Sequence, residues 1–290
     1  MKPRVAITVG DPAGIGPEIA SKAAADSRVL GACDPVVYAA ADPAVFVPGV
    51  LSAEAGRAAY ETIVAAVRDV QAGKVDAIAT APVNKLAFAR AGLPWKGHTD
   101  LLGHLTGSRD AVMMFWSQPL KVVLATVHLP LADVPRALTR EHLERIIDVT
   151  ARSLPAFGLA HPRIAVAGLN PHAGEDGLIG TEERDHIAPA VAAARAAGVD
   201  VTGPLPGDTV FVRAIRGEFD CVIACYHDQG LIPVKLAAFG HAVNVTLGLP
   251  IVRTSVDHGT AFDIAGRNVA DPGSMIEAVV LAAQLASRGR

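Results

Sequence analysis

The chain has 290 residues, about twice the length of an average domain, so it should form one large domain or two lobes. Hydrophobic residues make up 51% of the sequence and charged residues only 19%, a balance that supplies a buried core and excludes a disordered chain. The formal net charge is −3 and aromatic residues make up 4%. Because nucleic-acid binding needs a basic surface with stacking side chains, we expect no nucleic-acid partner.

Three features of the sequence predict a cytoplasmic protein with no membrane contact. The three cysteines, Cys33, Cys221 and Cys225, cannot all pair, so reduced thiols are the simplest interpretation. The longest uncharged apolar run, 236–252, contains a histidine, an asparagine, two glycines and a proline, which is a poor composition for a membrane span. The first residues lead directly into a strand-like run and show no signal-peptide core.

Short β-branched runs alternate with longer stretches of helical period along the chain. This alternation is typical of βα units around a buried, largely parallel sheet, and it predicts an α/β fold. The predicted strands are 4–9, 35–39, 77–80, 121–127, 163–167, 221–224 and 242–246. The predicted helices are 53–72, 140–153 with Thr139 as its cap, 181–197 and 273–287. The apolar stretch 111–120 fits either the core or an interface, and core is the simpler interpretation.

Three of the predicted strands are followed by a histidine: His128, His172 and His227. In open α/β sheets ligands bind beyond the carboxyl ends of the strands. If these strands share one sheet, the three imidazoles can converge on one divalent ion and leave positions open for substrate oxygens, as in a catalytic metal site. The alternative is that each histidine has a separate local role, as single histidines usually do. The residues alone leave both interpretations open.

Other strand ends offer groups suited to a polar or anionic substrate. The glycine-rich segment 10–18 enters a helix whose free amides could meet an anion, although an ordinary tight turn explains it equally well. Arg253 follows an apolar run and so emerges from the interior, whereas Lys235 taken alone fits a solvated surface charge. The candidate substrate-binding residues are His98, Thr99, Lys235, Asn244 and Arg253, and Lys85 lies near the first of them in sequence.

The segment 257–266, Asp-His-Gly-Thr-Ala-Phe-Asp-Ile-Ala-Gly, resembles the adenosine-binding loop of the isocitrate and isopropylmalate dehydrogenase superfamily. Within that superfamily the chain resembles the PdxA family, the 4-hydroxythreonine-4-phosphate dehydrogenases of pyridoxal phosphate biosynthesis. The matching motifs occur in order over almost the full length of the chain, at 10–18, 80–85, 97–100, 126–131, 170–175, 226–229 and 257–266.

The resemblance implies a two-lobed α/β/α fold with the active-site cleft between the lobes. We expect the first lobe to be discontinuous, formed by residues 1–90 and 265–290. The second lobe, residues 91–264, should then carry the metal ligands and the interface of a homodimer whose metal site lies between the subunits.

The resemblance also assigns roles to residues. It implies His128, His172 and His227 as ligands of one divalent ion, for which Zn, Co, Mg, Mn and Ni all remain open. It implies NAD as the cofactor, with NADP possible, since a carboxylate at Asp263 should repel a 2′-phosphate. The implied cofactor-binding residues are His258, Gly259, Ala261 and Asp263. Lys85 and Asp208 are the candidates for proton transfer, and the sequence does not choose between them.

The implied reaction is oxidation of the C3 hydroxyl of 4-phosphooxy-L-threonine, a small phosphorylated hydroxy-amino acid, followed by loss of CO2 to give 3-amino-2-oxopropyl phosphate. Two alternatives within the family act on 4-phospho-D-threonate or erythronate, or on a cis-dihydrodiol. An alternative from another class is a tri-histidine zinc hydrolase, which would leave the 257–266 loop unexplained.

Three departures from the family pattern stand out. The segment between Glu18 and His98 is shorter than expected by several tens of residues, so we expect a trimmed first lobe. Asp100 stands where the family has Glu, and Asp271 stands where the isopropylmalate enzymes place an adenine-contacting Asn. The last departure leaves the adenine contacts open.

Overall fold

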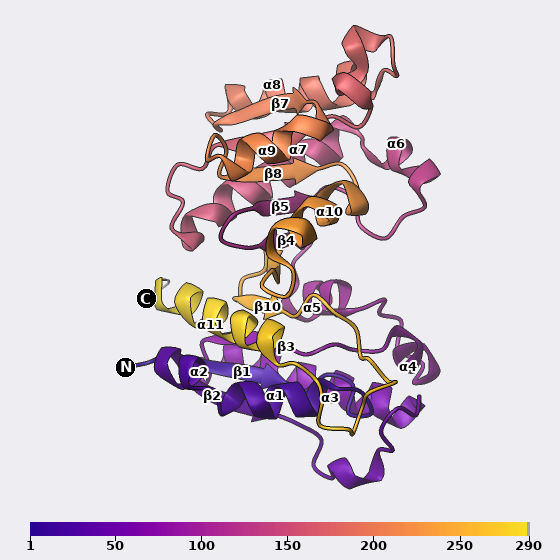
Figure 1. The fold of residues 1–290 in the computed structure, drawn as a ribbon, viewed down its shortest axis with the longest axis vertical. Helices are drawn as coiled ribbons and strands as arrows, with labels where there is room; N and C mark the ends of the chain where they lie inside the picture. Colours follow the sequence, from indigo (N-terminus) through magenta and orange to yellow (C-terminus); the bar gives the residue numbers. More distant parts are fainter. Residues whose placement is uncertain (289–290) are drawn as a thin grey trace. The chain divides into compact units, whose positions relative to one another are not determined.

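The computed structural model describes residues 1–288, which divide into two compact units (Figure 1). The first unit comprises residues 1–111 and the chain from 243 onward, and the second comprises residues 112–242. The sequence had placed the two crossings near residues 90 and 265. The second unit begins later and ends earlier than predicted. The reason is that α5 (His98–Thr106) packs on α3 (Ala53–Gln71) of the first unit and that two late strands join the sheet of the first unit.

The sheet of the first unit has the strand order β2–β1–β3–β10–β9. All neighbours are parallel except β9, which runs antiparallel to β10. Its strands are β1 (Arg4–Thr8), β2 (Asp34–Tyr38), β3 (Ala77–Thr80), β9 (Val243–Leu247) and β10 (Arg253–Ser255). The buried strands β1 and β3 are continuous apolar runs up to their terminal threonines, as expected for strands covered on both faces.

Helices cover both faces of this sheet. Side chains alternate between the faces along a strand, so Val5 and Ile7 pack on one side while Ala6 packs on the other. The first side is covered by α1 (Gly16–Ala24), α2 (Ser27–Ala32) and α11 (Gly273–Arg288). The other side is covered by α3, α4 (Lys85–Arg90) and α5, and the short helix η1 (Pro43–Val45) lies in the connection before α3.

The sheet of the second unit has the strand order β4–β5–β8–β6–β7. Its strands are β4 (Val112–Trp116), β5 (Lys121–Leu124), β6 (Ile164–Ala167), β7 (Val201–Leu205) and β8 (Cys221–Ala224). Only β4 is antiparallel to its neighbour β5. The sheet therefore presents the carboxyl ends of β5, β6, β7 and β8 at one edge.

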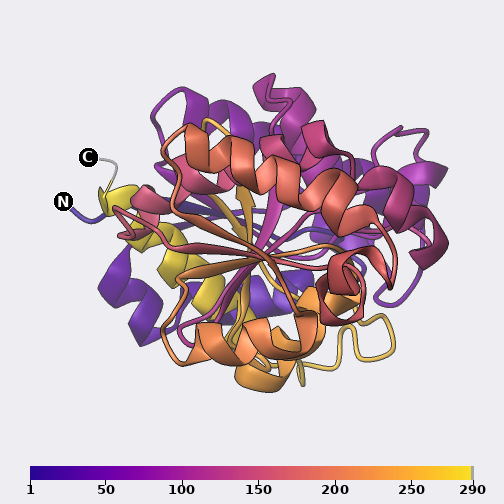
Figure 2. The ribbon, with the colours of Figure 1, turned by 90° about the horizontal axis from the view of Figure 1, so that it is seen from above.

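Helices also cover both faces of the second sheet, as the strands fanning out between salmon and orange helices in Figure 2 show. On one side lie α9 (Gly207–Ile215) and α10 (His227–Ala238), which bury Phe211 and Val234 against the strands. The other helices are α7 (Arg140–Ser153) and α8 (Ala188–Ala196). Short turns complete the unit: η2 (Leu131–Asp133), α6 (Val134–Ala137), η3 (Leu154–Phe157), η4 (Pro171–Gly177) and the π-helical η5 (Glu183–Ile187).

The predicted α/β class is confirmed, and every predicted strand forms. Helix α7 has the predicted bounds, and the Thr139 hydroxyl caps it by accepting the N–H of His142 at 3.2 Å. The predicted helix 181–197 forms as the π-helical turn η5, which continues directly into α8. The strands β4, β7 and β10 were not predicted: β7 contains a glycine and a proline, and β10 has only three residues.

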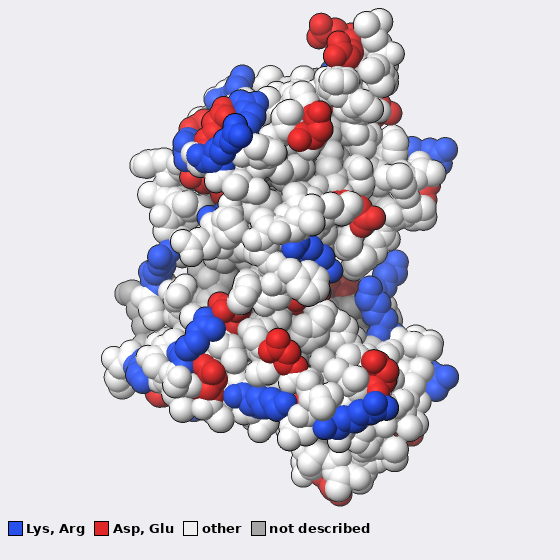
Figure 3. Space-filling model, in the orientation of Figure 1, with Lys and Arg blue, Asp and Glu red and all other residues white. Residues whose placement is uncertain are grey.

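Lys and Arg alternate with Asp and Glu over the face shown in Figure 3, without a broad field of one sign. Within residues 1–288, no helix has the length and apolar composition needed to cross a membrane.

Candidate functional site

A row of polar side chains crosses the carboxyl end of the sheet in the first unit. Thr8 pairs in register with Thr80, Thr80 with Ser255, and Ser255 with Asn244. Paired residues of neighbouring strands point to the same face of a sheet, so these four side chains form one line. The Thr80 hydroxyl donates to the Ser255 hydroxyl at 3.0 Å inside this line.

Arg253 lies beneath this row and is only 2% exposed. Its Nη2 donates to the Thr80 hydroxyl at 2.7 Å and its Nη1 to the Thr246 hydroxyl at 2.9 Å. Burial lowers the pKa of Arg253 to about 9, so the guanidinium is still charged at neutral pH. Both of its partners are neutral hydroxyls, and no carboxylate among the described residues pairs with it. A buried cation without a counter-ion is suited to receive an anion.

His98 begins helix α5 beside this cation. Burial, and to a smaller extent the charge of Arg253, hold the pKa of His98 well below its usual value. Its imidazole is therefore neutral at pH 7 and can both donate and accept a hydrogen bond. Lys85, exposed at the start of α4, is nearby: a methyl group on Gly97 would lie 3.9 Å from its Cε. The half-buried Thr99 follows His98 on the same first turn of α5.

Unsatisfied buried polar atoms concentrate at this end of the sheet. Among the described residues, five buried side-chain nitrogen and oxygen atoms have no hydrogen-bond partner. They are Thr8 Oγ1, Asp11 Oδ2, His98 Nε2, Asn244 Oδ1 and Arg253 Nε. Three belong to residues that the sequence predicted as substrate contacts. Buried polar groups in native proteins are almost always paired, so this cluster indicates a place for a polar ligand.

The predicted nucleotide loop, residues 257–266, follows β10 and packs against the glycine-rich turn after β1. The Ile15 N–H donates to the Thr260 carbonyl at 3.0 Å. A methyl group on Gly14 would lie 2.8 Å from that same carbonyl oxygen, so only glycine allows this approach. Ala261 has a positive φ of 42°, and Asp263 is exposed. The loop is thus ordered against the turn while its carboxylate stays accessible.

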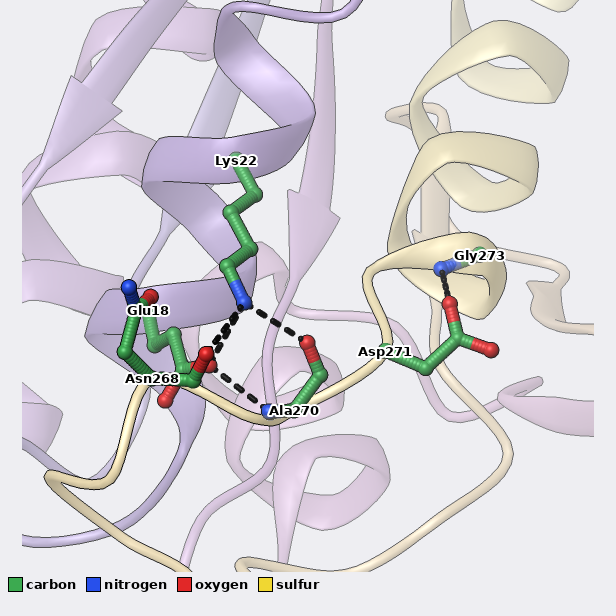
Figure 4. A network of polar contacts seen from close by, with 6 residues as sticks. All are labelled: Glu18, Lys22, Asn268, Ala270, Asp271 and Gly273. Atoms are coloured by element: carbon green, nitrogen blue, oxygen red, sulfur yellow. Dashed lines mark hydrogen bonds and ion pairs between the residues drawn. The ribbon is translucent and has the colours of Figure 1, made fainter.

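Helix α1 anchors the chain that leaves this loop (Figure 4). The Lys22 ammonium donates to the carbonyls of Asn268 at 3.3 Å and Ala270 at 3.0 Å, and it pairs with Glu18 at 2.7 Å. Glu18 in turn accepts the N–H of Ala270 at 2.7 Å. Asp271, the departure from the related adenine-binding pattern, accepts the N–H of Gly273 at 2.8 Å and so caps α11. The Asp271 carboxylate therefore has a structural partner already.

In the second unit, the histidines after β5 and β8 lie close together. The ring centroids of His128 and His227 are 5.7 Å apart. The Nδ1 of His227 is 2.7 Å from Asp228 Oδ1. Ligand histidines commonly present one nitrogen to the metal while the other is fixed by a carboxylate, and this contact leaves the Nε2 of His227 for a metal. This donor set fits a divalent ion.

The third histidine is not part of a three-ligand group. Among residues 1–288, no cluster of three or more His, Cys, Asp or Glu side chains is placed to hold a metal ion. The three imidazoles do not form such a group within one chain, and their joint role as metal ligands stays a prediction. The physical reason is that the chain after β6 turns into a left-handed segment that leaves the side chain of His172 64% exposed.

Buried hydrogen bonds nevertheless tie the three histidine-bearing segments together. The Thr126 hydroxyl donates to the Cys225 carbonyl at 2.7 Å. Gln229 accepts the Cys225 N–H at 2.7 Å and donates to the Gly168 carbonyl at 2.7 Å. This network joins the ends of β5, β8 and β6. Sequence reasoning noted Gln229 only as a neighbour of His227, because nothing in the sequence shows that β6 and β8 are adjacent strands.

The two remaining predicted residues of this unit are exposed. Lys235 lies near the end of α10 and Asp208 in the first turn of α9. A methyl group on Gly207, the first residue of α9, would lie 3.0 Å from Gln229 Nε2. The first turn of α9, which carries Asp208, therefore lies next to the network.

Comparison with known proteins identifies the family. The family model "Pyridoxal phosphate biosynthetic protein PdxA" matches residues 15–282. The chain is 44% identical to the 4-hydroxythreonine-4-phosphate dehydrogenase of Janthinobacterium sp. (strain Marseille), with 100% of this chain and 98% of the relative covered. It is 43% identical to the D-threonate 4-phosphate dehydrogenase of Pectobacterium atrosepticum, covering 97% of this chain and 99% of the relative.

Solved structures agree with these relatives. The crystal structure of 4-hydroxythreonine-4-phosphate dehydrogenase from Klebsiella pneumoniae matches with a TM-score of 0.90 at 42% identity, covering 99% of this chain and 98% of that one. Isocitrate dehydrogenase from Methylococcus capsulatus, at 16% identity and a TM-score of 0.51 over 94% of this chain and 82% of its own, shares the fold alone.

The alignment with the Janthinobacterium relative spans 337 positions although this chain has only 290 residues, so the relative has segments that this chain lacks. This agrees with the expectation that the chain is shorter than its family, while the place of the shortening stays a prediction. The motif order, the two-unit α/β fold and these matches together show that the chain belongs to the PdxA family of pyridoxal phosphate biosynthetic proteins.

Proposed function

We propose that this protein is a metal-dependent, NAD-linked dehydrogenase that oxidises the C3 hydroxyl of 4-phosphooxy-L-threonine. The observation that carries the proposal is the cluster of unpaired buried atoms on His98, Asn244 and Arg253. A charged guanidinium with only hydroxyl partners needs an anion, and the proposed substrate brings a phosphate and a carboxylate. The relatives named above act on phosphorylated four-carbon acids of this kind.

The residues of the first unit would bind and orient the substrate. Arg253 and Asn244 would hold its anionic end, and the neutral His98 would donate or accept beside them. Such binding far from the reacting carbon fixes the orientation of the C3 hydroxyl, which is how remote binding energy supports a reaction. Lys85, in its unprotonated amine form, would take the hydroxyl proton, since its side chain lies next to Gly97 at the start of α5. Thr99 and, in the second unit, Lys235 would add polar contacts, and Asp208 is the alternative proton acceptor.

The nucleotide would be bound by the 257–266 loop through His258, Gly259, Ala261 and Asp263. When bound, NAD would serve as the acceptor of the hydride from C3. With the hydroxyl proton, which goes to the protein base, the substrate loses two electrons and two protons and becomes a β-keto acid. This acid then loses CO2 to give 3-amino-2-oxopropyl phosphate. We propose NAD over NADP because the exposed carboxylate of Asp263 would face the ribose and repel a 2′-phosphate.

The metal ion would be held by His128 and His227 together with His172. When bound, the ion would serve as a Lewis acid toward the substrate oxygens. Because the structure does not bring His172 into a three-ligand group within one chain, we propose that the set is completed in a homodimer, with histidines of two copies at one ion. The contact between His227 and Asp228 fixes which ring nitrogen is available.

An exposed apolar stripe on α10 supports the dimer. Ile232, Leu236 and Phe239 recur at helical spacing and are 59%, 84% and 79% exposed. Leu131, close to His128 in sequence, is 65% exposed. Large apolar side chains grouped beside a metal-binding segment are typical of a subunit interface. A second copy of the chain is the partner that would also supply the missing ligand.

A second candidate substrate is 4-phospho-D-threonate, which the similarity to the Pectobacterium enzyme favours. The two substrates differ at C2, where threonine carries an ammonium and threonate a hydroxyl. The test is NADH formation by the metal-loaded protein with each substrate, with and without a chelator. Turnover of the threonine derivative supports the first assignment, and turnover of the threonate alone moves the assignment to the second.

Failure with both substrates would direct attention to cis-dihydrodiols, which need no phosphate. Absence of NADH binding would instead contradict the redox proposal and favour the hydrolase alternative. Binding of NADH can be measured by its fluorescence without any substrate, so a failed substrate and a failed cofactor are distinguished.

A further inference from the structure

The segment that carries His172 has an unusual backbone. Six successive residues, 172–177, have positive φ values, and four of them are not glycine. His172 has a φ of 54° and Glu175 a φ of 46°. L-residues other than glycine adopt this left-handed region rarely and at an energetic cost, and a run of them persists only where the surroundings impose it. Some contact outside the segment must therefore hold it.

The buried carboxylate of Glu183 makes this contact, beside Glu182, whose Oε2 accepts a hydrogen bond from Asn170 Nδ2 at 2.7 Å. Glu183 binds both the backbone and the side chain of Asn170. Its Oε1 accepts the backbone N–H of Asn170 at 2.7 Å, and its Oε2 accepts Nδ2 of the same side chain at 2.9 Å. A methyl group on Gly174 would lie 2.7 Å from Oε2, and one on Gly168 would lie 3.2 Å from Oε1. The chain before and after His172 is thus wrapped around one carboxylate.

Glu183 is buried at 4% exposure, although its neighbours in sequence, Glu182 and Arg184, are more exposed. Within residues 1–288 it takes part in no ion pair, so its charge is satisfied by the hydrogen bonds of this segment alone. It also begins the π-helical turn η5, and such turns are frequent at functional sites. A carboxylate used only for stability would more often be exposed or paired with a cation.

We propose that Glu183 is a positioning residue that holds the segment 170–177, with the left-handed run that begins at His172, in the conformation that presents His172 to the metal ion. The inference rests on the proposed function, because it takes His172 as a ligand. Glu183 itself touches neither metal nor substrate. Its effect passes through Asn170, as partners behind metal ligands set ligand orientation and affinity.

The test is a titration of the purified full-length protein with Co²⁺, followed by the visible absorption bands of the bound ion. Glu183→Gln places an amide N–H2 group opposite either the N–H or the Nδ2 of Asn170, so one hydrogen bond becomes a clash between donors. We expect the Kd for Co²⁺ to rise about 10- to 100-fold, the usual effect of removing a partner of a ligand. We also expect the bands to shift, and excess Co²⁺ to restore kcat.

Two further variants keep the test decisive. Asn170→Ala keeps its backbone N–H bond to Glu183 and removes the side-chain bonds to Glu183 and Glu182, so it should fold and weaken Co²⁺ binding by a smaller factor. Asp185→Asn is the matched control: this carboxylate is exposed on the same turn and pairs with Arg184, and its removal should leave the Kd within about twofold.

The outcomes distinguish failure of the positioning role of Glu183 from failure of the proposed function. If His172→Ala loses Co²⁺ while folded Glu183→Gln binds it with wild-type affinity and spectrum, the positioning role is refuted. If Glu183→Gln does not fold, unchanged affinity in Asn170→Ala refutes it equally. If the wild type binds no Co²⁺, or His172→Ala binds it normally, the metal assignment of the proposed function fails, and the inference fails with it.

Discussion

Replacing Arg253 by Met tests the idea that the first unit holds a cation for an absent anion. Burial lowers the pKa of Arg253 from 12.5 to about 9. Each pKa unit corresponds to roughly 1.4 kcal/mol, so keeping this side chain charged costs the folded state about 5 kcal/mol at neutral pH. Because the folded-state pKa is depressed, this cost applies at every pH below about 9.

The hydrogen bonds of the guanidinium offset this cost. A bond from a charged donor contributes roughly 1.5–3 kcal/mol, and Arg253 makes two, to Thr80 and Thr246. The two contributions nearly cancel. We therefore expect Arg253→Met, which keeps a long side chain in the space, to change the free energy of unfolding by less than about 2 kcal/mol, although the site is fully buried.

Substrate binding should respond very differently. A buried charge-assisted bond to an anion contributes on the order of 2–4 kcal/mol, so the KM for the phosphorylated substrate should rise about 30- to 1000-fold. Urea unfolding and initial-rate kinetics measure the two effects. Arg213→Met, which removes an exposed partner of Glu218, is the control and should change neither quantity appreciably.

Two results would refute this reasoning. A loss of stability above about 4 kcal/mol would mean that the protein itself satisfies the guanidinium, as expected when a buried group is removed from a closed network. An unchanged KM would mean that no substrate anion reaches Arg253.

Four further predictions concern protonation, metal, cofactor and assembly. Because the pKa of His98 is well below its unfolded value of 6.5, the unfolded state takes up a proton before the folded state does as the pH falls. The free energy of unfolding should therefore decrease by up to about 1.4 kcal/mol per pH unit below pH 6.5. In urea unfolding curves, His98→Gln should flatten this pH dependence. Asp228→Asn should raise the Kd for Co²⁺ about tenfold, and unchanged absorption spectra would contradict the orienting role of the carboxylate. Asp263→Ser should lower the ratio of kcat/KM for NAD to that for NADP by about tenfold, and an unchanged ratio would place the ribose elsewhere. Leu236→Glu should turn the proposed dimer into a monomer in sedimentation analysis, and a wild-type profile would show that the exposed stripe on α10 is not the interface.

The amino-acid sequence was sufficient for the α/β class, because hydrophobic runs bounded by turn residues depend only on local order along the chain. Ala77–Thr80 and Cys221–Ala224 were predicted with their observed bounds, since each is a short buried run. β7 was missed because Gly203 and Pro204 oppose strand formation locally, and only pairing with β6 makes this segment a strand.

For the candidate site too, the sequence determined some features and the tertiary structure determined others. The sequence identified the histidines at the strand ends, and the order of its motifs identified the family, since both are properties of residues in a row. The tertiary structure alone decided which of these residues meet. Strand order places Thr8, Thr80, Ser255 and Asn244 in one line, which no reading of separate motifs predicts.

His172 and Glu183 show the difference most clearly. The family resemblance implied that His172 joins two other histidines at one ion, whereas the residues alone left open a separate local role for each. The structure wraps the residues after β6 around the buried carboxylate of Glu183, and no local pattern distinguishes this glutamate from its half-buried neighbour Glu182. The reason is physical: the conformation of this segment depends on hydrogen bonds from Asn170 to a carboxylate thirteen positions along the chain, and bonds across such a separation exist only once the chain has folded.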